Sequence, residues 1–296
     1  MSVAARDISG GRRSAALVEG EFLFTAEDFE RIKRMLYQQS GINLTEGKAT
    51  LVYSRLAKRL RALGLPSFHA YCELVASAQG AEERLSMLTA LTTNVTRFYR
   101  EPHHFDHLRD EVLPALIDKA RRGEKVRLWS AACSSGQEPY SMAMTLMQMM
   151  PDAPQRDIRI LATDIDPRIL ATARKGVYSE ELIDAVPANL RRECFDRADG
   201  AGRDWQVRAP LRELVAFREL NLLGEWPMKG RFDAIFCRNV VIYFDEPTQE
   251  RVWGRFAPLL VENGALYIGH SERVTGPAAL QFVSDGMTTY RKRAVR

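Results

Sequence analysis

The sequence has few cysteines, no apolar run long enough to span a membrane and no glycine motif of the form G-x-G-x-x-G. Its 4 cysteines stand apart, with no CxxC pair, which argues against a disulfide framework or a zinc site and favours a reducing compartment. The first twenty residues lack the sustained apolar core of a secretory signal. These absences predict a soluble, cytoplasmic protein.

Excess charge of one sign is also scarce. The 296 residues carry a net charge of +4, with 27% charged and 46% hydrophobic side chains. A basic excess of this size is too small to argue for nucleic acid unless it is clustered. The composition is that of an ordinary globular protein, and the chain is long enough for two domains.

The first third of the chain has the apolar spacing of helices. Residues 1–20 are rich in Gly, Ser and Ala, and we expect them to form a disordered tail. Residues 21–95 predict a small helical domain, with Thr25 as the N-cap of the first helix. In the helix that ends before Gly64, one face is expected to carry Val52, Leu56, Leu60 and Leu63.

Strands that alternate with helices are expected from about residue 125. The short apolar runs are 125–131, 157–165, 215–222, 231–239 and 264–271. Helical stretches between several of them predict a parallel sheet with both faces covered. The last run of apolar residues is expected to add an antiparallel hairpin around Asp285-Gly286. Residues 189–214 do not fit the alternation, and we interpret them as an inserted β-rich subdomain.

Four features fall at the carboxyl ends of these strands, where ligands bind in open α/β sheets. A turn of small residues at 131–136 would let a ligand approach the backbone. Asp164 ends the next strand, and an acid there can accept both hydroxyls of a ribose. The other two features are Asn221-Leu222, suited to an adenine, and Arg238-Asn239 followed by Tyr243.

Each feature also has a purely structural interpretation. A small-residue strand end is often a packing device, and Asp164 or Asp166 could cap the helix that starts near Pro167. Tyr243 could be a core tyrosine, and the methionines at 142–150 are expected in a helix core. The convergence of all four features at one sheet edge favours a binding site.

The acid at Glu138 discriminates between candidate ligands. It follows the small-residue turn, where it would repel a pyrophosphate. S-adenosylmethionine carries an ammonium and a sulfonium and has no phosphate. Together with the missing glycines, Glu138 therefore favours S-adenosylmethionine over a nicotinamide dinucleotide.

Six blocks of sequence carry a resemblance to a known family. They are LTTNVTRFYREPHHF (91–105), SAACSSGQEPYSMAM (130–144), ATDIDPRIL (162–170), NLL (221–223), FDAIFCRNVVIYFD (232–245) and LYIGHSE (266–272). In this order and spacing they closely resemble the chemotaxis receptor methyltransferases, the CheR family of protein-glutamate O-methyltransferases. The resemblance covers nearly the whole chain from about Glu21.

The resemblance implies an α/β, class I S-adenosylmethionine-dependent methyltransferase domain, Rossmann-like, at 96–296, with a small β insert at about 189–214. An all-α receptor-docking domain at 21–95 would precede it. The implied reaction methylates glutamate carboxylates on the cytoplasmic helices of chemoreceptors and leaves S-adenosylhomocysteine. In some members the insert also docks a C-terminal receptor pentapeptide, and the sequence leaves open whether this chain does so.

The resemblance also implies the site residues. Cofactor contacts would fall on Asn94, Thr96, Arg100, Glu138, Asp164, Asn221, Leu222, Arg238 and Asn239. Arg100 and Tyr243 would lie near the transferred methyl group.

The acceptor requires little activation. A glutamate carboxylate has an unperturbed pKa of about 4.3, so no general base is needed at neutral pH. Exclusion of water and alignment of the reacting atoms would supply most of the acceleration.

Three alternatives stay open on these residues alone: a nicotinamide dehydrogenase, a binding-only signalling adaptor that senses S-adenosylmethionine, and a nucleic-acid methyltransferase.

A basic helix face is the candidate for receptor docking. Lys48, Arg55, Lys58 and Arg59 fall within an arc of roughly 80–100° on a helical wheel. Four like charges on one face are costly without a partner, so we expect this face to meet an acidic receptor helix.

His103 and His107 lie four residues apart on an expected helix, but no further spaced ligand accompanies them and no metal is expected.

Overall fold

The computed structural model describes residues 16–92, 95–198 and 202–294. It divides into two compact units: residues up to 39 with 43–92, and residues 40–42 with those from 93 onward. No helix of the described residues is long and apolar enough to cross a membrane.

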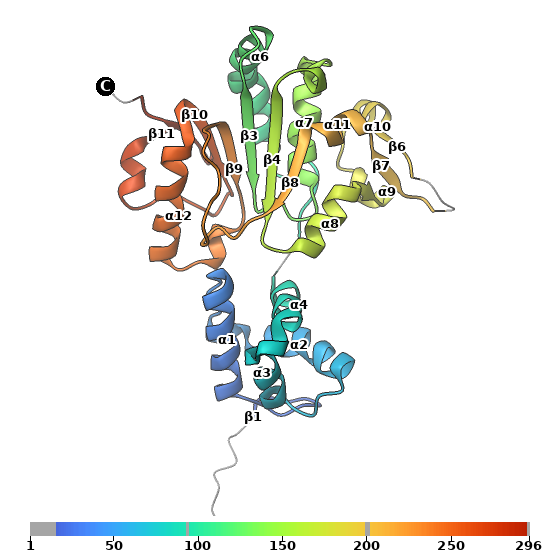
Figure 1. The fold of residues 1–296 in the computed structure, drawn as a ribbon, viewed down its shortest axis with the longest axis vertical. Coiled ribbons are helices and arrows are strands. Elements are labelled where there is room, and N and C mark those ends of the chain that lie inside the picture. Colours follow the sequence, from blue (N-terminus) through green and yellow to red (C-terminus); the bar gives the residue numbers. More distant parts are fainter. Residues whose placement is uncertain (1–15, 93–94, 199–201, 295–296) are drawn as a thin grey trace, which may run out of the picture. The chain divides into compact units, whose positions relative to one another are not determined.

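The first unit is a group of helices with one short pair of strands (Figure 1). Its first helix begins after Thr25, which exchanges hydrogen bonds with Asp28: the Asp28 N–H donates to Thr25 Oγ1, and the Thr25 N–H donates to the Asp28 carboxylate. The second helix ends at Gly64, whose φ of 65° closes the last turn. The bounds are β1 Ala16–Val18, β2 Phe24–Thr25, α1 Ala26–Ser40, η1 Glu46–Lys48, α2 Ala49–Leu63, α3 Phe68–Ala76, η2 Ala78–Gly80 and α4 Ala81–Leu91.

The predicted apolar face of α2 is largely confirmed. Val52, Leu56 and Leu60 are fully buried. Leu63 was expected on the same face but is exposed. It is the last residue of the helix, directly before the turn at Gly64.

The second unit is built on a seven-stranded sheet in the order β11-β12-β10-β9-β3-β4-β8. Neighbouring strands from β10 to β8 are parallel, while β12 pairs antiparallel with both β10 and β11. The predicted C-terminal hairpin is therefore confirmed. The strands are β3 Val126–Ala131, β4 Ile158–Asp164, β8 Val215–Glu219, β9 Phe232–Cys237, β10 Leu260–Ile268, β11 Phe282–Ser284 and β12 Thr289–Lys292.

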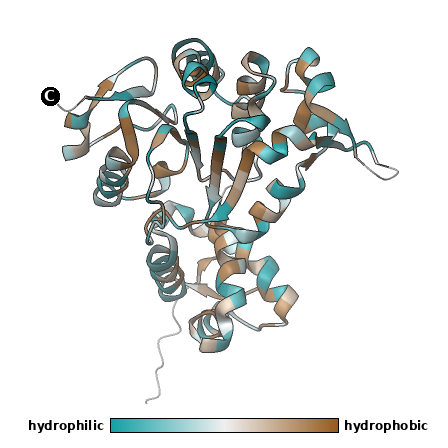
Figure 2. Ribbon diagram, turned by 45° about the horizontal axis from the view of Figure 1, so that its top comes forward, coloured by the Kyte–Doolittle hydropathy of each residue, from teal (hydrophilic) through white to brown (hydrophobic). Residues whose placement is uncertain are grey.

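Helices cover both faces of this sheet, as the sequence predicts. Adjacent residues of one strand enter different cores: Leu128 packs with α7, whereas Trp129 packs with α12. Hydrophobic residues accordingly run through the central strands in Figure 2. The elements are α5 His103–His107, η3 Leu108–Val112, α6 Leu113–Arg121, α7 Gln137–Met149, η4 Ala153–Gln155, α8 Pro167–Lys175, η5 Val241–Tyr243, α12 Glu246–Leu259 and η6 Pro277–Gln281.

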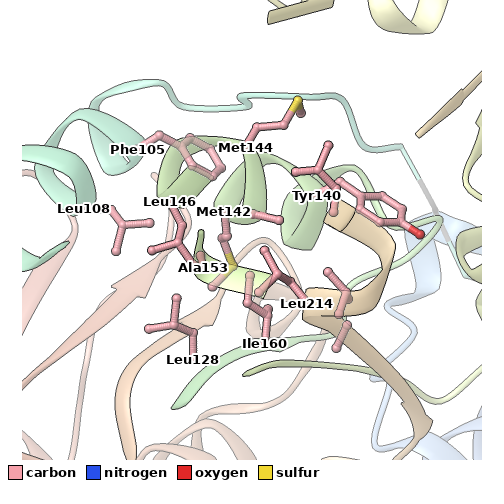
Figure 3. Close-up of a cluster of buried hydrophobic side chains, with 14 of the residues drawn as sticks. Phe105, Leu108, Leu128, Tyr140, Met142, Met144, Leu146, Ala153, Ile160 and Leu214 are labelled. Carbon is pink, nitrogen blue, oxygen red and sulfur yellow. The ribbon is translucent and has the colours of Figure 1, made fainter. Parts of the chain in front are cut away.

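The methionines of α7 are core residues, as expected. Met142 and Met144 are fully buried, and Figure 3 shows them among Leu128, Leu146 and Ile160. Helix α7 is thereby fixed against the sheet, which places its N-terminus at the small-residue turn.

A separate three-stranded sheet, in the order β5-β7-β6, lies in the connection between β4 and β8. It begins earlier than the expected start at residue 189, because β5 supplies one of its edge strands. Val177 and Tyr178 pair antiparallel with Gln206 and Trp205 of β7. The bounds are β5 Val177–Tyr178, α9 Glu180–Ile183, α10 Ala188–Cys194, β6 Phe195–Arg197, β7 Trp205–Val207 and α11 Ala209–Leu214.

Candidate functional site

The small-residue turn after β3 contains three residues with positive φ: Ala132 at 63°, Ser134 at 50° and Gly136 at 96°. A Cβ on Gly136 would lie 2.9 Å from Tyr178 Oη and 3.0 Å from Ala173 Cβ, so a larger residue would push the turn apart. Tyr178 also donates to the Ser135 carbonyl at 2.6 Å. The turn is therefore held in a left-handed geometry at the carboxyl edge of the sheet.

Asp164 ends β4 beside this turn and is only 7% exposed. Its carboxylate accepts from the Ser134 N–H at 2.8 Å and from the Asp166 N–H at 3.1 Å. Burial raises the pKa of Asp164, and these backbone donors act against the rise. Each oxygen keeps a lone pair, so the carboxylate can still accept hydroxyl donors.

Arg238 lies between two carboxylates in the second unit. Its guanidinium is 3.0 Å from Glu138 and 3.2 Å from Glu101. Burial raises the pKa of Glu138, while Arg238 and a hydrogen bond from Ser130 oppose the rise. Burial acts in the same direction on Glu101, but Arg238 and hydrogen bonds from Asn239 and His270 outweigh it and lower its pKa to about 2.

This cluster has one cation for two carboxylates. Its formal charge with both acids ionised is −1, from the single guanidinium of Arg238 against Glu101 and Glu138. Arg238 Nε and Ser134 Oγ are buried without a hydrogen-bond partner among the described residues. Buried polar atoms of this kind normally have partners, so both atoms suit a polar ligand. The cluster fits the ammonium and sulfonium of S-adenosylmethionine better than an anionic pyrophosphate.

Arg100 sits in a strained turn. Its neighbours Tyr99 and Glu101 have φ values of 50° and 56°, which are unusual for residues other than glycine. The Arg238 guanidinium donates to the Arg100 carbonyl, and Arg100 itself donates to the Val95 carbonyl at 2.9 Å. Arg100 thus contacts Arg238 through its backbone carbonyl, whereas the side chain of Arg100 binds the Val95 carbonyl.

The remaining expected cofactor residues differ in their burial and in their hydrogen-bond partners. Asn239 has a φ of 58° and donates to Glu101 at 3.2 Å. Asn221 accepts from the Leu223 N–H at 2.9 Å, and Leu222 is buried in the core on the α12 side. Thr96 is half-buried. Asn94 lies outside the described residues.

Tyr243 follows β9 in the turn η5 and is half-buried against the core on the α12 side. The structural interpretation of Tyr243 as a packing residue and the functional one as a residue near the methyl group are both compatible with this position. Its catalytic role stays a prediction.

Asp166, by contrast, has the structural role that the sequence allowed. Its side chain accepts from the Arg168 N–H at 2.8 Å and caps α8.

Sequence reasoning missed two acids of the site region, Glu101 and Glu272. Both lie inside blocks that were quoted for the family resemblance. The Glu272 carboxylate accepts hydrogen bonds from backbone N–H groups of the segment after β9, and Glu101 binds the side chains at its start. Position within a block was their only signal in the sequence.

The histidines near the site are engaged within the second unit. His104 Nε2 lies 2.9 Å from Thr288 Oγ1, and burial lowers the pKa of His104 to about 3. His107 bridges Tyr267 and Asp285. Ligand atoms of Glu101, His103 and His104 lie within 4.8 Å of one another, but Glu101 already pairs with Arg238. The expectation of no metal stays a prediction.

The structure corrects one assumption about the proposed docking face in the first unit, namely that its four basic side chains lack partners within the chain. Arg59 makes a two-point ion pair with buried Glu83, at 3.0 and 2.6 Å, and Glu83 also accepts from Tyr71. Arg55 donates to the carbonyls that end α4, those of Ala90, Leu91 and Thr92. These two arginines have partners inside the unit, so the expected cost of four like charges was wrong. Lys48 and Lys58 are exposed.

Comparison with known proteins agrees with this geometry. The chain matches the profile "CheR methyltransferase, all-alpha domain" over residues 27–92 and "CheR methyltransferase, SAM binding domain" over residues 94–290. It is 57% identical over 258 residues to a probable chemotaxis protein methyltransferase of Rhizobium etli, covering 87% of this chain and 96% of that one.

Two further relatives cover similar lengths. Chemotaxis protein methyltransferase 2 of Pseudomonas aeruginosa is 45% identical, over 91% of this chain and 94% of the relative. The chemotaxis protein methyltransferase of Escherichia coli is 44% identical, over 88% and 89% respectively.

These matches and the seven-stranded sheet confirm the expected class I methyltransferase fold with an all-α N-terminal region. They do not support a binding-only adaptor or a nicotinamide dehydrogenase. The chain belongs to the CheR family of S-adenosylmethionine-dependent chemotaxis methyltransferases.

Proposed function

We propose that this chain transfers the methyl group of S-adenosylmethionine to glutamate carboxylates on the cytoplasmic helices of chemoreceptors. The products are glutamate methyl esters and S-adenosylhomocysteine. The observation that carries the cofactor half of the proposal is the cluster of buried Arg238 with the half-buried Glu101 and Glu138, whose formal charge is −1. The substrate half follows from membership of the family.

The cofactor would be held from three sides. Asp164 would accept the ribose hydroxyls, Glu138 would face the ammonium, and Asn221 with Leu222 would contact the adenine. The two carboxylate partners of Arg238 hold its guanidinium in place. The other cofactor contacts carried over from the family are Asn94, Thr96 and Arg100.

The residues near the methyl group have orienting roles. Bound S-adenosylmethionine supplies an electrophilic methyl group on a cationic sulfur. The acceptor glutamate is ionised at neutral pH, so this chain needs to align it and to exclude water. Arg100 would hold the carboxylate by a charge-assisted hydrogen bond, and Tyr243 would position the methyl group or donate to the carboxylate.

Receptor docking would use the exposed lysines of the first unit. Lys48 and Lys58 are solvent-exposed at the start and in the second half of α2, and they suit the acidic surface of a receptor helix. Arg55 and Arg59 keep a share in this surface through their charge, although their guanidinium groups have internal partners.

A receptor tail is a second proposed contact. In the small sheet β7 lies between β5 and β6, which are therefore its edges. An extended C-terminal pentapeptide could add to one edge by backbone hydrogen bonding. Fluorescence anisotropy of a labelled receptor pentapeptide should show saturable binding, and a scrambled peptide is the control.

Methyl transfer itself is the decisive test. The protein is incubated with methyl-labelled S-adenosylmethionine and a purified receptor cytoplasmic fragment. We expect label in the receptor that is released as methanol by base, as an ester requires. A fragment whose acceptor glutamates are changed to alanine is the control, with DNA and RNA as alternative acceptors. Base-stable label, or label in nucleic acid alone, would contradict the proposal.

A further inference from the structure

The segment that follows β9 points its backbone N–H groups at one side chain. The N–H groups of Asn239, Val240, Val241 and Ile242 donate to the carboxylate of Glu272, at 3.0, 3.0, 2.8 and 3.3 Å. The Gly269 N–H adds a fifth bond at 2.6 Å. Successive N–H groups that converge in this way form an anion-binding concavity, and here the anion belongs to the chain itself.

Both carboxylate oxygens are used. Oε1 accepts from residues 240, 241 and 242, and Oε2 accepts from residues 239 and 269. Glu272 is only 9% exposed, so its charge depends on these donors for the hydrogen bonds that water would give. Without the carboxylate, several N–H groups would be left without a partner, which costs roughly the same as losing a hydrogen bond for each.

The clamped segment joins three of the residues expected at the candidate site. Arg238 and Asn239 lie at its start, and Tyr243 follows directly after its end. Asn239 has a φ of 58°, in the left-handed region that asparagine tolerates better than most residues, and its side chain donates to Glu101. The carboxylate of Glu272 accepts from the N–H of this same residue. It therefore fixes the backbone from which Arg238, Asn239 and Tyr243 project.

We infer that Glu272 is a positioning residue for methyl transfer, acting as an internal anion that fixes the segment 239–242. The inference rests on the proposed function, because its readout is the transfer of a methyl group. Glu272 acts through the backbone of this segment and is not itself in contact with the acceptor. Its contribution should appear in the rate of the chemical step as well as in the stability of the fold, and the rate is the property that a merely structural carboxylate would leave unchanged.

Glu272→Gln is the sharpest variant. The substitution keeps the shape but replaces one acceptor oxygen by an NH₂ group. Whichever way the amide turns, this NH₂ faces at least two backbone N–H groups, because each oxygen has at least two donors. We expect the single-turnover rate at saturating cofactor to fall roughly 10- to 100-fold, as small misplacements of reacting groups do.

Asp233→Asn is the matched control. Asp233 is buried near the start of β9, the strand whose other end leads into the segment 239–242, and it accepts from the Arg127 N–H at 2.8 Å and from Lys119 at 2.6 Å. It is a carboxylate of similar burial that touches no residue of the candidate site. The control should lower the melting temperature yet keep a single-turnover rate within about threefold of wild type below that temperature.

A chemical rescue tests the charge directly. Glu272→Ala removes the acetate-shaped end of the side chain, so added acetate can occupy the space and accept the same N–H groups. Acetate should restore at least part of the transfer rate in this variant. Acetamide, its neutral counterpart, should not, and at constant ionic strength neither compound should change the wild-type rate.

The outcomes separate this inference from the proposed function. If wild type forms no base-labile ester, the proposed function fails before Glu272 is tested. If wild type is active, a Glu272→Gln rate within twofold of wild type overturns the inference. A loss of rate in Glu272→Gln that the Asp233→Asn control matches, with no acetate rescue in Glu272→Ala, also overturns it. A selective loss with acetate rescue supports it.

Discussion

Asp164 and Asp166 are two residues apart, yet the structure gives them different partners. The side chain of Asp166 caps α8. Asp164 holds the turn at Ser134 and the N–H of Asp166 itself, while it stays at the end of β4. Its proposed contact with a ribose is thus combined with a structural contact, and a substitution must separate the two.

Asp164→Asn should weaken cofactor binding while one oxygen still supports the turn. Loss of charge-assisted hydrogen bonds costs roughly 1.5–3 kcal/mol, which is about 10- to 100-fold in affinity. Isothermal titration of S-adenosylhomocysteine measures this loss, with circular dichroism as the control for folding. Unchanged affinity in a folded variant would remove Asp164 from the site.

Arg100→Ala and Tyr243→Phe should lower turnover more than cofactor affinity. Both side chains are proposed to act on the acceptor and the methyl group, so their loss should affect the transition state more than the bound cofactor. Single-turnover kinetics at saturating cofactor decide the matter. Wild-type rates in both variants would exclude a catalytic role for these residues.

Glu101 links stability to pH. Its pKa is lowered from an ordinary value of 4.5 to about 2. A carboxyl group with a lowered pKa stabilises the fold fully above its unfolded pKa, and this contribution is lost as pH falls toward the folded pKa. The stabilisation from Glu101 should therefore be present above pH 4.5 and decline between pH 4.5 and about 2.

Glu101→Gln tests this linkage. The difference in unfolding free energy between wild type and this variant should shrink as pH falls through that window. Urea unfolding at several acidic pH values measures it, and Asp106→Asn, on the exposed surface nearby, is the control. A difference independent of pH would mean that the ion pair with Arg238 does not set the pKa of Glu101.

Helix α2 is tied to α4 by its arginines. Arg59→Ala would leave the buried carboxylate of Glu83 with Tyr71 but without its cation. We expect a loss of roughly 1–3 kcal/mol in unfolding free energy of the first unit. Thermal or urea unfolding of the full chain measures it. Lys58→Ala, on the exposed part of the same helix, should change stability by less than about 0.5 kcal/mol.

The elements differ in how far sequence predicts them. The strands β3, β4, β8, β9 and β10 follow from short apolar runs, because burial on both faces leaves few alternatives for such segments. Strand β5 has two residues and exists only because β7 pairs with it, so no local pattern could show it. Pairing partners from distant segments override local preference in such cases.

The site shows the same limit. The acids and amides at the strand ends were predictable because parallel strands bring their carboxyl ends to one edge. The partners of Arg55 and Arg59 were not, since a helical wheel shows which residues share a face but not what packs against it. The bonds of Glu272 were also hidden, because its partners are backbone groups that every residue possesses.

The division into two units separates the proposed cofactor site from the proposed receptor-docking surface. Glu138, Asp164 and Arg238 belong to the second unit, and Lys48 and Lys58 to the first. Lys48→Glu with Lys58→Glu should therefore lower receptor methylation several-fold at limiting receptor and leave S-adenosylhomocysteine affinity unchanged.

The same docking contact should depend on salt. Exposed charges are screened beyond about 8–10 Å at physiological ionic strength, so wild-type methylation should decline as salt rises to several hundred millimolar. The double lysine variant should show a shallower decline. Equal salt dependence in both proteins, with equal methylation at low salt, would place receptor docking elsewhere.

The small sheet has a consequence for how the chain tolerates change in length. It lies in residues 165–214, between β4 and β8, which are adjacent and paired at Ile160 and Val215. The entropy of closing such a loop grows only with the logarithm of its length, and doubling the loop costs about 0.6 kcal/mol. Tyr178 anchors the first part of the loop to Ser135. Insertions and deletions between β6 and β7 should therefore be nearly neutral for the fold, which leaves the length of that connection free to vary.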